Sequence, residues 1–149
     1  MKLGIFTKPI HVEKIVNYLN QNTGVDYIIS TNKQEIESFE FDIGVSYCFP
    51  HIIDIKDKTW YNYHPGPPKY PGMTNYSKPV KDKVTDFAVM CHKMTNEVDK
   101  GPIVKIKHIK LDSIPVNSNE LGNITHYYLF QLFKETIEDL KKWKYLYLK

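Results

Sequence analysis

The chain has 149 residues, a length that favours one domain with a sizeable core. Its 20 basic and 17 acidic residues give a net charge of +3, and every basic residue is lysine, which argues against a dedicated nucleic-acid binder. No apolar run approaches the ~20 residues of a membrane span. Because Cys48 and Cys91 form neither a disulfide framework nor a metal motif, and no secretion signal is present, we expect a reduced cytoplasmic protein.

The first third of the chain alternates between strand and helix patterns. Residues 2–6 predict a strand that is followed by no glycine-rich nucleotide loop. An amphipathic helix comes next, because apolar residues recur at i, i+3, i+4 and i+7: Val12, Ile15, Val16 and Leu19. Residues 25–29 predict a second strand, and Thr31 to Gln34 match a capping box for a short helix over residues 32–38.

Two more strands are expected at residues 43–47 and 60–63, with one or two helical turns at 76–80. This alternation predicts an open, mostly parallel α/β sheet of the Rossmann-like kind, with right-handed crossovers and flanking helices. Later β runs at 87–92 and 103–111 form an extension, and the second of these alternates strictly, so it should be half exposed.

A capping box at residues 117–120 opens the last helix, which should pack along the sheet. Its apolar stripe consists of Leu129, Leu132, Phe133, Ile137, Leu140 and Trp143. We predict one domain over residues 1–149, with no linker or internal repeat.

The most informative stretch is Tyr61 to Gly72. Asn62 and His64 are separated by one residue, so an extended chain would point both side chains to the same side. Four prolines and two glycines follow within eight positions, and no regular helix or strand tolerates that composition. The pattern predicts a strand that delivers an amide and an imidazole into a rigid loop, at the sheet edge where α/β proteins bind ligands.

Asp99 follows the first of the later β runs and completes a candidate set with Asn62 and His64. An amide can donate to an oxygen that becomes negative, a histidine can move a proton, and a carboxylate can orient that histidine. With no serine or cysteine placed beside the histidine, the set suits direct acyl transfer to an amine. Each residue also has a plain structural interpretation, as a turn asparagine, a loop histidine and a turn aspartate.

The other five histidines share no metal-ligand spacing, and we interpret them as structural or exposed: His11, His51, His92, His108 and His126. The lysine-rich end of the chain is typical of a helix C-terminus and only weakly suggests RNA binding.

Two motifs together resemble the folate-dependent formyltransferase family. The first runs from Asn62 through His64-Pro-Gly-Pro-Pro to Gly72, and the second runs from His92-Lys-Met94 through Asp99-Lys-Gly-Pro to Ile103. The resemblance implies a donor, 10-formyltetrahydrofolate, and no metal. It implies that Asn62 and His64 stabilise the oxyanion, and that Asp99 orients His64 or acts through water and helps the proton leave the attacking amine. It also implies a donor pocket lined by Tyr47, Cys48, Phe49, Pro50, Thr95 and Val98.

Within that family the chain is most similar to the sugar N-formyltransferases. The acceptor would then be the amine of a nucleotide-linked sugar, contacted by Tyr70, Gly72 and Met73. The alternatives are a glycinamide ribonucleotide or methionyl-tRNA formyltransferase, a formyltetrahydrofolate hydrolase, and a non-catalytic folate-binding remnant. The N-terminal half is shorter than the family pattern, and the protein would be a monomer or homodimer with neither nucleic-acid nor membrane partners.

Overall fold

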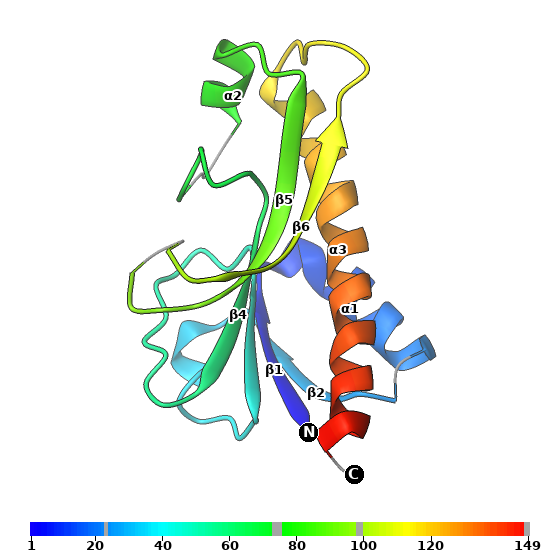
Figure 1. Ribbon diagram of the computed structural model, residues 1–149. Helices are drawn as coiled ribbons and strands as arrows, with labels where there is room; N and C mark the ends of the chain where they lie inside the picture. The colour runs from blue at the N-terminus through cyan, green and yellow to red at the C-terminus, as the bar shows by residue number, and fades with distance from the viewer. Residues whose placement is uncertain (23, 73–75, 98–99, 148–149) are drawn as a thin grey trace. The chain divides into compact units, whose positions relative to one another are not determined.

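The computed structural model describes residues 1–22, 24–72, 76–97 and 100–147 (Figure 1). In chain order the elements are β1 (Lys2–Thr7), α1 (Pro9–Asn22), β2 (Asp26–Ser30), the 3₁₀ helix η1 (Lys33–Glu35), β3 (Ile43–Tyr47), β4 (Thr59–His64), α2 (Ser77–Lys81), β5 (Asp86–Lys93), β6 (Ile103–Lys110) and α3 (Ser118–Tyr147). Among them, no helix combines the length and the apolar character that crossing a lipid bilayer requires.

The strands form one mixed sheet in the order β2-β1-β3-β4-β5-β6. β1 pairs in parallel with both β2 and β3, whereas β5 and β6 pair antiparallel. This confirms the predicted fold class, an open α/β sheet with a late antiparallel extension. The chain divides into two compact units: unit 1 comprises Met1–Asn62 and Lys134–Lys149, and unit 2 comprises Tyr63–Phe133. A single domain over the whole chain stays a prediction.

Aromatic rings form the core of unit 1 around β1. Phe6 is fully buried, with its ring centroid 5.9 Å from that of Phe41 and 5.6 Å from that of Trp60. Two glycines make room for these rings, because a Cβ on Gly44 would lie 2.1 Å from the Trp60 indole and one on Gly4 would lie 2.4 Å from Phe41. The strands can therefore pack large rings against their backbones.

α1 was predicted from its apolar stripe, and its packing follows that stripe. Ile15 and Leu19 are buried, while Val12 and Val16 are half-buried. On a neighbouring turn, the Tyr18 hydroxyl donates to the Lys134 carbonyl and to Glu138, each at 3.2 Å. These bonds fasten α1 to the last part of α3 within unit 1.

The predicted helix over residues 32–38 is wrong in both its start and its length. Asn32, not Thr31, caps it, with its side-chain oxygen accepting from the Gln34 amide at 3.0 Å. Only Lys33–Glu35 form a helix, and it is of the 3₁₀ type. Asparagine competes well for this position because its short side chain reaches the amide two residues on.

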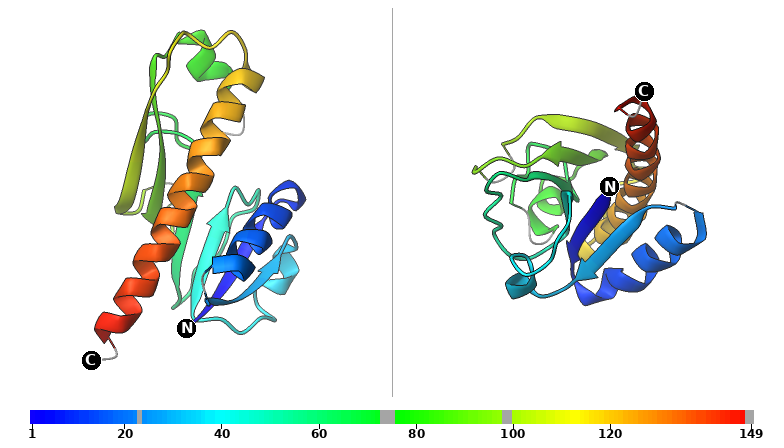
Figure 2. Two further views of the ribbon diagram at one scale, coloured as in Figure 1. Left: turned by 90° about the vertical axis from the view of Figure 1, so that its right-hand side faces the viewer. Right: turned by 90° about the horizontal axis from the view of Figure 1, so that it is seen from below.

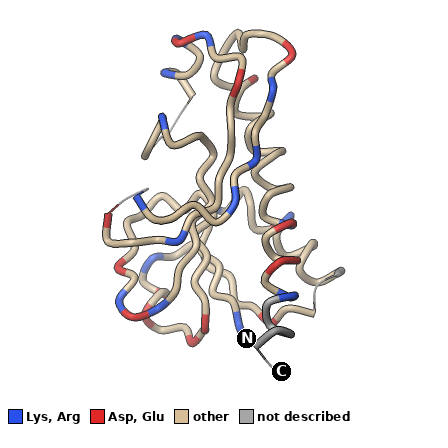
Figure 3. Tube along the Cα trace, in the orientation of Figure 1, with Lys and Arg blue, Asp and Glu red and all other residues tan. Residues whose placement is uncertain are grey.

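In unit 2, β5 is buried along almost its whole length, from Phe87 to His92. The predicted half-exposure of β6 is only partly correct, because Ile103 and Val104 at its start are themselves exposed, at 49% and 40%. Lysines follow the β6 trace (Figure 3). Such charges on the outermost strand of a sheet discourage pairing with other chains.

The predicted cap of the last helix is confirmed. The Asn117 side chain accepts from the Glu120 amide, and the Glu120 carboxylate accepts from the Val116 amide, both at 2.9 Å. The first half of α3 runs beside the β5–β6 hairpin (Figure 2). Of its predicted stripe, the members with described side chains are all buried: Leu129, Leu132, Phe133, Ile137 and Leu140.

Candidate functional site

β4 carries two of the three predicted catalytic residues. It ends at His64, so Asn62 and His64 lie at its carboxyl end, with Asn62 half-buried and His64 only 4% exposed. Trp60, two residues before Asn62, is buried and anchors the start of the strand. The strand runs one residue further at each end than the predicted 60–63, and its end has an amide and an imidazole spaced by one residue.

The hydrogen bond of the His64 ring fixes where its proton lies. Nε2 of His64 is 3.0 Å from the backbone carbonyl oxygen of Tyr70. A carbonyl can only accept, so Nε2 must carry the hydrogen. In the neutral ring Nδ1 is then the nitrogen with the lone pair, and it is the one that can take up a proton.

Tyr70 lies at the end of the proline-rich turn and is held at three points. Its amide donates to the Pro67 carbonyl at 3.0 Å, its ring lies 6.1 Å from that of Phe87, and its hydroxyl donates to Asp82 at 2.7 Å. Burial, together with the Asp82 carboxylate, raises the pKa of Tyr70 to about 12. Tyr70 is only 4% exposed, and its predicted contact with the acceptor stays a prediction.

Gly72 is exposed and has a φ of 59°, a conformation that glycine adopts without strain. Thr95 is exposed as well, and its hydroxyl accepts from the Glu97 amide at 3.3 Å and donates to the Glu97 carbonyl at 3.1 Å. The predicted site residues Met73, Val98 and Asp99 lie outside the described residues.

The predicted donor-binding segment begins inside the core of unit 1. Tyr47, the last residue of β3, is fully buried, and its ring centroid lies 5.3 Å from that of His11. Its carbonyl accepts from the Thr7 hydroxyl at 2.7 Å. Cys48 follows with a φ of 53° and is partly buried, and burial raises the pKa of its thiol to about 12 against the opposing effect of nearby lysines. Tyr47 is therefore part of the core, and its predicted contact with the donor stays a prediction.

Past Cys48 the segment turns outward. Phe49 is buried, with its ring 5.0 Å from that of His51, whereas Pro50 and His51 are exposed and Ile52 is 75% exposed. Pro50, His51 and Ile52 are therefore the part of this segment that faces solvent. His51 and Ile52 were not among the predicted site residues, because His51 was interpreted as structural or exposed and the residue type of Ile52 does not report which way it faces.

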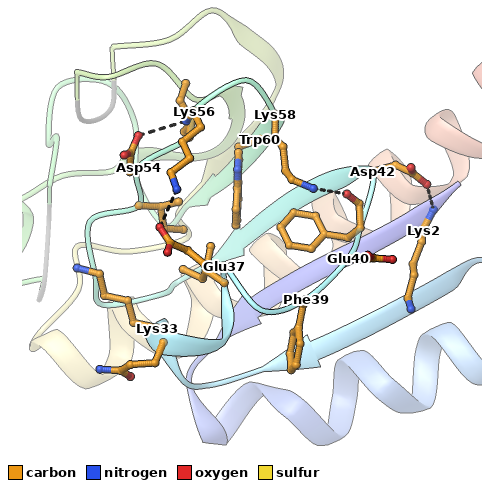
Figure 4. A pocket seen from close by; sticks show the side chains of 15 residues that line it. Lys2, Lys33, Glu37, Phe39, Glu40, Asp42, Asp54, Lys56, Lys58 and Trp60 are labelled. Carbon is orange, nitrogen blue, oxygen red and sulfur yellow. Dashed lines mark hydrogen bonds and ion pairs between the residues drawn. The ribbon is translucent and has the colours of Figure 1, made fainter.

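Unit 1 also contains a cavity of about 970 Å³, which the sequence did not predict (Figure 4). It lies beside Lys2, Asp42 and Lys58, at the amino ends of β1, β3 and β4, whereas Tyr47 and Asn62 lie toward the opposite ends of β3 and β4. A 2.8 Å ion pair joins Lys56 to Glu37 beside it.

The wall of this cavity is braced by Lys58. Its Nζ donates to the Phe41 carbonyl at 2.6 Å and sits 4.3 Å from the centre of the Phe41 ring. Aromatic side chains, Phe39, Phe41 and Trp60, supply much of its apolar lining. This cavity is not part of the candidate site, because it lies at the amino ends of the strands, whereas open α/β sheets bind ligands at the carboxyl ends.

No family model matches the sequence, and no curated protein matches it. Solved structures do match. Phosphoribosylglycinamide formyltransferase from Campylobacter jejuni aligns with a TM-score of 0.73 at 16% identity, over 94% of this chain and 97% of that one. The chain has the formyltransferase fold.

Sugar-modifying enzymes align equally well with the formyltransferase fold of this chain. An N-formyltransferase from Helicobacter canadensis, solved with folinic acid and dTDP-3-aminofucose, aligns with a TM-score of 0.73 at 21% identity. The alignment covers 93% of this chain but only 63% of that protein. A sugar N-formyltransferase from a Shewanella species aligns with a TM-score of 0.74 at 18% identity, over 97% of this chain and 71% of the other.

Proposed function

We propose that this chain is an N-formyltransferase that moves the formyl group of 10-formyltetrahydrofolate to the amine of a nucleotide-linked amino sugar. One observation carries the proposal: within a formyltransferase fold, β4 ends in Asn62-Tyr63-His64, and the ring of His64 has its proton placed on Nε2 by Tyr70. A strand end with a non-titrating donor and an oriented imidazole suits an acyl transfer that passes through an oxyanion.

The reaction balances with the groups present. The acceptor nitrogen attacks the formyl carbon, the carbonyl oxygen becomes an oxyanion, and the bond to the folate nitrogen breaks. In this scheme the Asn62 amide donates to the oxyanion, and Nδ1 of His64 takes the proton that the attacking amine loses. His64 then gives this proton to the folate nitrogen as its bond to the formyl carbon breaks, which leaves the formylated amine and tetrahydrofolate. Asp99, a predicted partner of His64, would favour the protonated ring. No metal enters the scheme.

The exposed segment Pro50–Ile52 fits the donor. A pterin is flat, with apolar faces and polar edges, and this segment offers an exposed isoleucine, an exposed histidine and backbone polar groups. We assign the donor to this segment together with Cys48 and Phe49. Thr95 and Val98 are the proposed donor contacts from the later loop, and Gly72 and Met73 the proposed contacts for the acceptor.

A second acceptor class, a phosphoribosyl-linked amine, is favoured by the 97% coverage of the Campylobacter enzyme. The connection after β1 supports the sugar acceptor over this second class. β1 ends at Thr7 and α1 begins at Pro9, so only Lys8 connects them, and proline has no N–H to offer a phosphate. The glycine-rich first loop that the family resemblance gives to glycinamide ribonucleotide enzymes has no room here.

The test incubates the protein with 10-formyltetrahydrofolate and a panel of nucleotide-linked amino sugars plus glycinamide ribonucleotide, with products read by mass spectrometry. We expect a formylated sugar. Asn62→Ala and His64→Ala should each lower turnover by roughly 10²–10³-fold. His108→Ala, which changes an exposed histidine on β6, is the matched control and should not affect turnover.

Other outcomes would replace the proposal. Formylated glycinamide ribonucleotide would favour the second acceptor class. Release of tetrahydrofolate without any formylated amine would identify a hydrolase. Tight donor binding without turnover would identify a folate-binding remnant, and normal turnover in both strand variants would contradict the assigned site.

A further inference from the structure

Nε2 of His64 is hydrogen-bonded to a backbone carbonyl, so whatever fixes that carbonyl helps to fix the imidazole. The carbonyl belongs to Tyr70, six residues further along the chain and beyond the proline-rich turn. Among the described residues, the groups that hold Tyr70 are Pro67, Asp82 and Phe87, and all three belong to unit 2 with His64.

The backbone of Tyr70 has one local restraint, the 3.0 Å hydrogen bond from its amide to the Pro67 carbonyl. Pro65, Pro67, Pro68 and Pro71 restrict φ through the turn. The side chain supplies a restraint from outside the turn, because the Tyr70 hydroxyl donates to Asp82 at 2.7 Å. The ring is thereby fixed at its far end as well as at its Cα.

The backbone of Asp82 is itself held by hydrogen bonds at the end of a helix. It closes the C-terminus of α2, where its amide donates to the Lys78 carbonyl at 2.9 Å. The next residue, Lys83, adopts a φ of 55° and donates its amide to the Val80 carbonyl at 3.0 Å. These bonds complete a helix end, so the Asp82 carboxylate projects from a fixed backbone.

We propose that Asp82 is a positioning residue for the reaction assigned above, acting on His64 through the hydroxyl and the carbonyl of Tyr70. Asp82 holds the phenol, the phenol holds the Tyr70 backbone, and the Tyr70 carbonyl keeps the hydrogen of His64 on Nε2. The role rests on the proposed function, but the placement of the proton does not.

Other charged groups near Tyr70 do not replace Asp82. The Lys69 and Lys78 ammonium groups lie 5.6 Å and 5.9 Å from the centre of the Tyr70 ring. Cations can interact with the ring face but cannot accept the hydroxyl hydrogen. An acceptor is needed at the hydroxyl, and Asp82 supplies it.

The test compares four variants with the wild-type chain: Tyr70→Phe, Asp82→Ala, Asp82→Asn and Tyr18→Phe. Tyr18→Phe is the matched control, because Tyr18 also donates its hydroxyl to a carboxylate, Glu138, but in unit 1. The first measurement is the ¹⁵N NMR signals of the His64 ring nitrogens, assigned with a His64→Gln variant. The second is steady-state kinetics of formyl transfer, with thermal unfolding as the check on folding.

We expect one protonated Nε2 and one unprotonated Nδ1 in the wild-type chain and in Tyr18→Phe. In Tyr70→Phe and Asp82→Ala the two ring signals should move toward each other as both tautomers become populated. Turnover should then fall about tenfold with little change in KM, because the imidazole is misplaced rather than lost. Asp82→Asn should keep most of the wild-type separation between the two ring signals, because its amide oxygen can still accept from the phenol.

Unchanged ring signals in both Tyr70→Phe and Asp82→Ala would overturn the proposal, as would equal changes in Tyr18→Phe. The NMR measurement needs neither donor nor acceptor. Absence of formyl transfer in the wild-type chain would therefore count against the proposed function alone, while the ring signals would still decide the role of Asp82 in placing the proton.

Discussion

Aromatic packing holds the candidate residues of unit 1, whereas hydrogen bonds hold His64 in unit 2. In unit 1, Trp60 is 1% exposed and lies over Gly44 and against Phe6, two residues before Asn62 on β4. In unit 2, Nε2 of His64 is hydrogen-bonded to the Tyr70 carbonyl. Contact among rings depends on volume, and a hydrogen bond depends on the identity of both partners.

The difference predicts how each region responds to mutation. A packed ring cluster should resist any change of volume, and its loss should appear as a lower free energy of unfolding. A chain of hydrogen bonds at a strand end should tolerate small changes of shape, and its loss should appear first in the behaviour of the imidazole. Four measurements separate these two kinds of response.

The largest loss of stability is expected for Gly44→Ala, with Gly122→Ala as the comparison in unit 2. In Gly44→Ala the new methyl group would lie 2.1 Å from the buried Trp60 indole, which should lower the free energy of unfolding by about 1–3 kcal/mol or more. In Gly122→Ala the methyl group would meet the Tyr76 ring edge at 3.0 Å, and the gain in helix propensity of up to ~1 kcal/mol should offset that contact. Chemical denaturation measures both, and a neutral Gly44→Ala would contradict tight ring packing.

A second test uses alkaline pH. The pKa values of Tyr18 in unit 1 and Tyr70 in unit 2 are both raised from 10.0 to about 12, by burial and by their carboxylate partners. Between these values the folded chain binds the phenolic proton more tightly than the unfolded chain does, so the free energy of unfolding falls as pH rises from 10 to 12. Below pH 10 both contributions are complete.

Each phenylalanine variant should therefore lose less stability than the wild-type chain over this pH range. Denaturant midpoints between pH 9 and pH 12 measure the effect. Equal pH slopes in Tyr18→Phe and the wild-type chain would show that neither burial nor Glu138 raises the pKa of Tyr18 in solution. The same comparison for Tyr70→Phe tests burial and Asp82 together.

The sequence predicted the strands well, because buried strands in this chain are short apolar runs bounded by turn residues. β3 was predicted with its observed bounds, and the cap at Asn117 was identified from its spacing. Prediction failed at residues 31–38, where two adjacent residues can both cap and only the geometry of the turn selects Asn32. It also failed at the start of β6, where Ile103 and Val104 are exposed.

The candidate site was predicted as a set of residue types but not as an arrangement. Asn62 and His64 could be found because a strand followed by prolines is visible in the sequence. The tautomer of His64 could not be found, because it depends on a carbonyl that the turn brings back to the ring. The exposure of Ile52 was hidden for a similar reason, since apolar residue types alone do not report which way a segment faces.

A smaller difference is expected between the rates at which the two thiols, one in each unit, react with a disulfide reagent. Burial raises the pKa of both Cys48 and Cys91 to about 12, so both should react slowly with a disulfide reagent at pH 8. Cys48 is partly exposed and Cys91 is 1% exposed, so Cys48 should react first. Cys48→Ser should remove the faster phase of the labelling trace, and loss of the slower phase instead would contradict the described burial.

The smallest effect is expected for the exposed ion pair beside the cavity of unit 1. Its side chains, Lys56 and Glu37, are 58% and 75% exposed, so water and salt screen their attraction. Glu37→Gln should leave the denaturant midpoint unchanged, in contrast to Gly44→Ala in the same unit. A salt-sensitive loss of stability in Glu37→Gln would show that this pair acts with its neighbours as a network, and that charge supplements packing in holding unit 1 together.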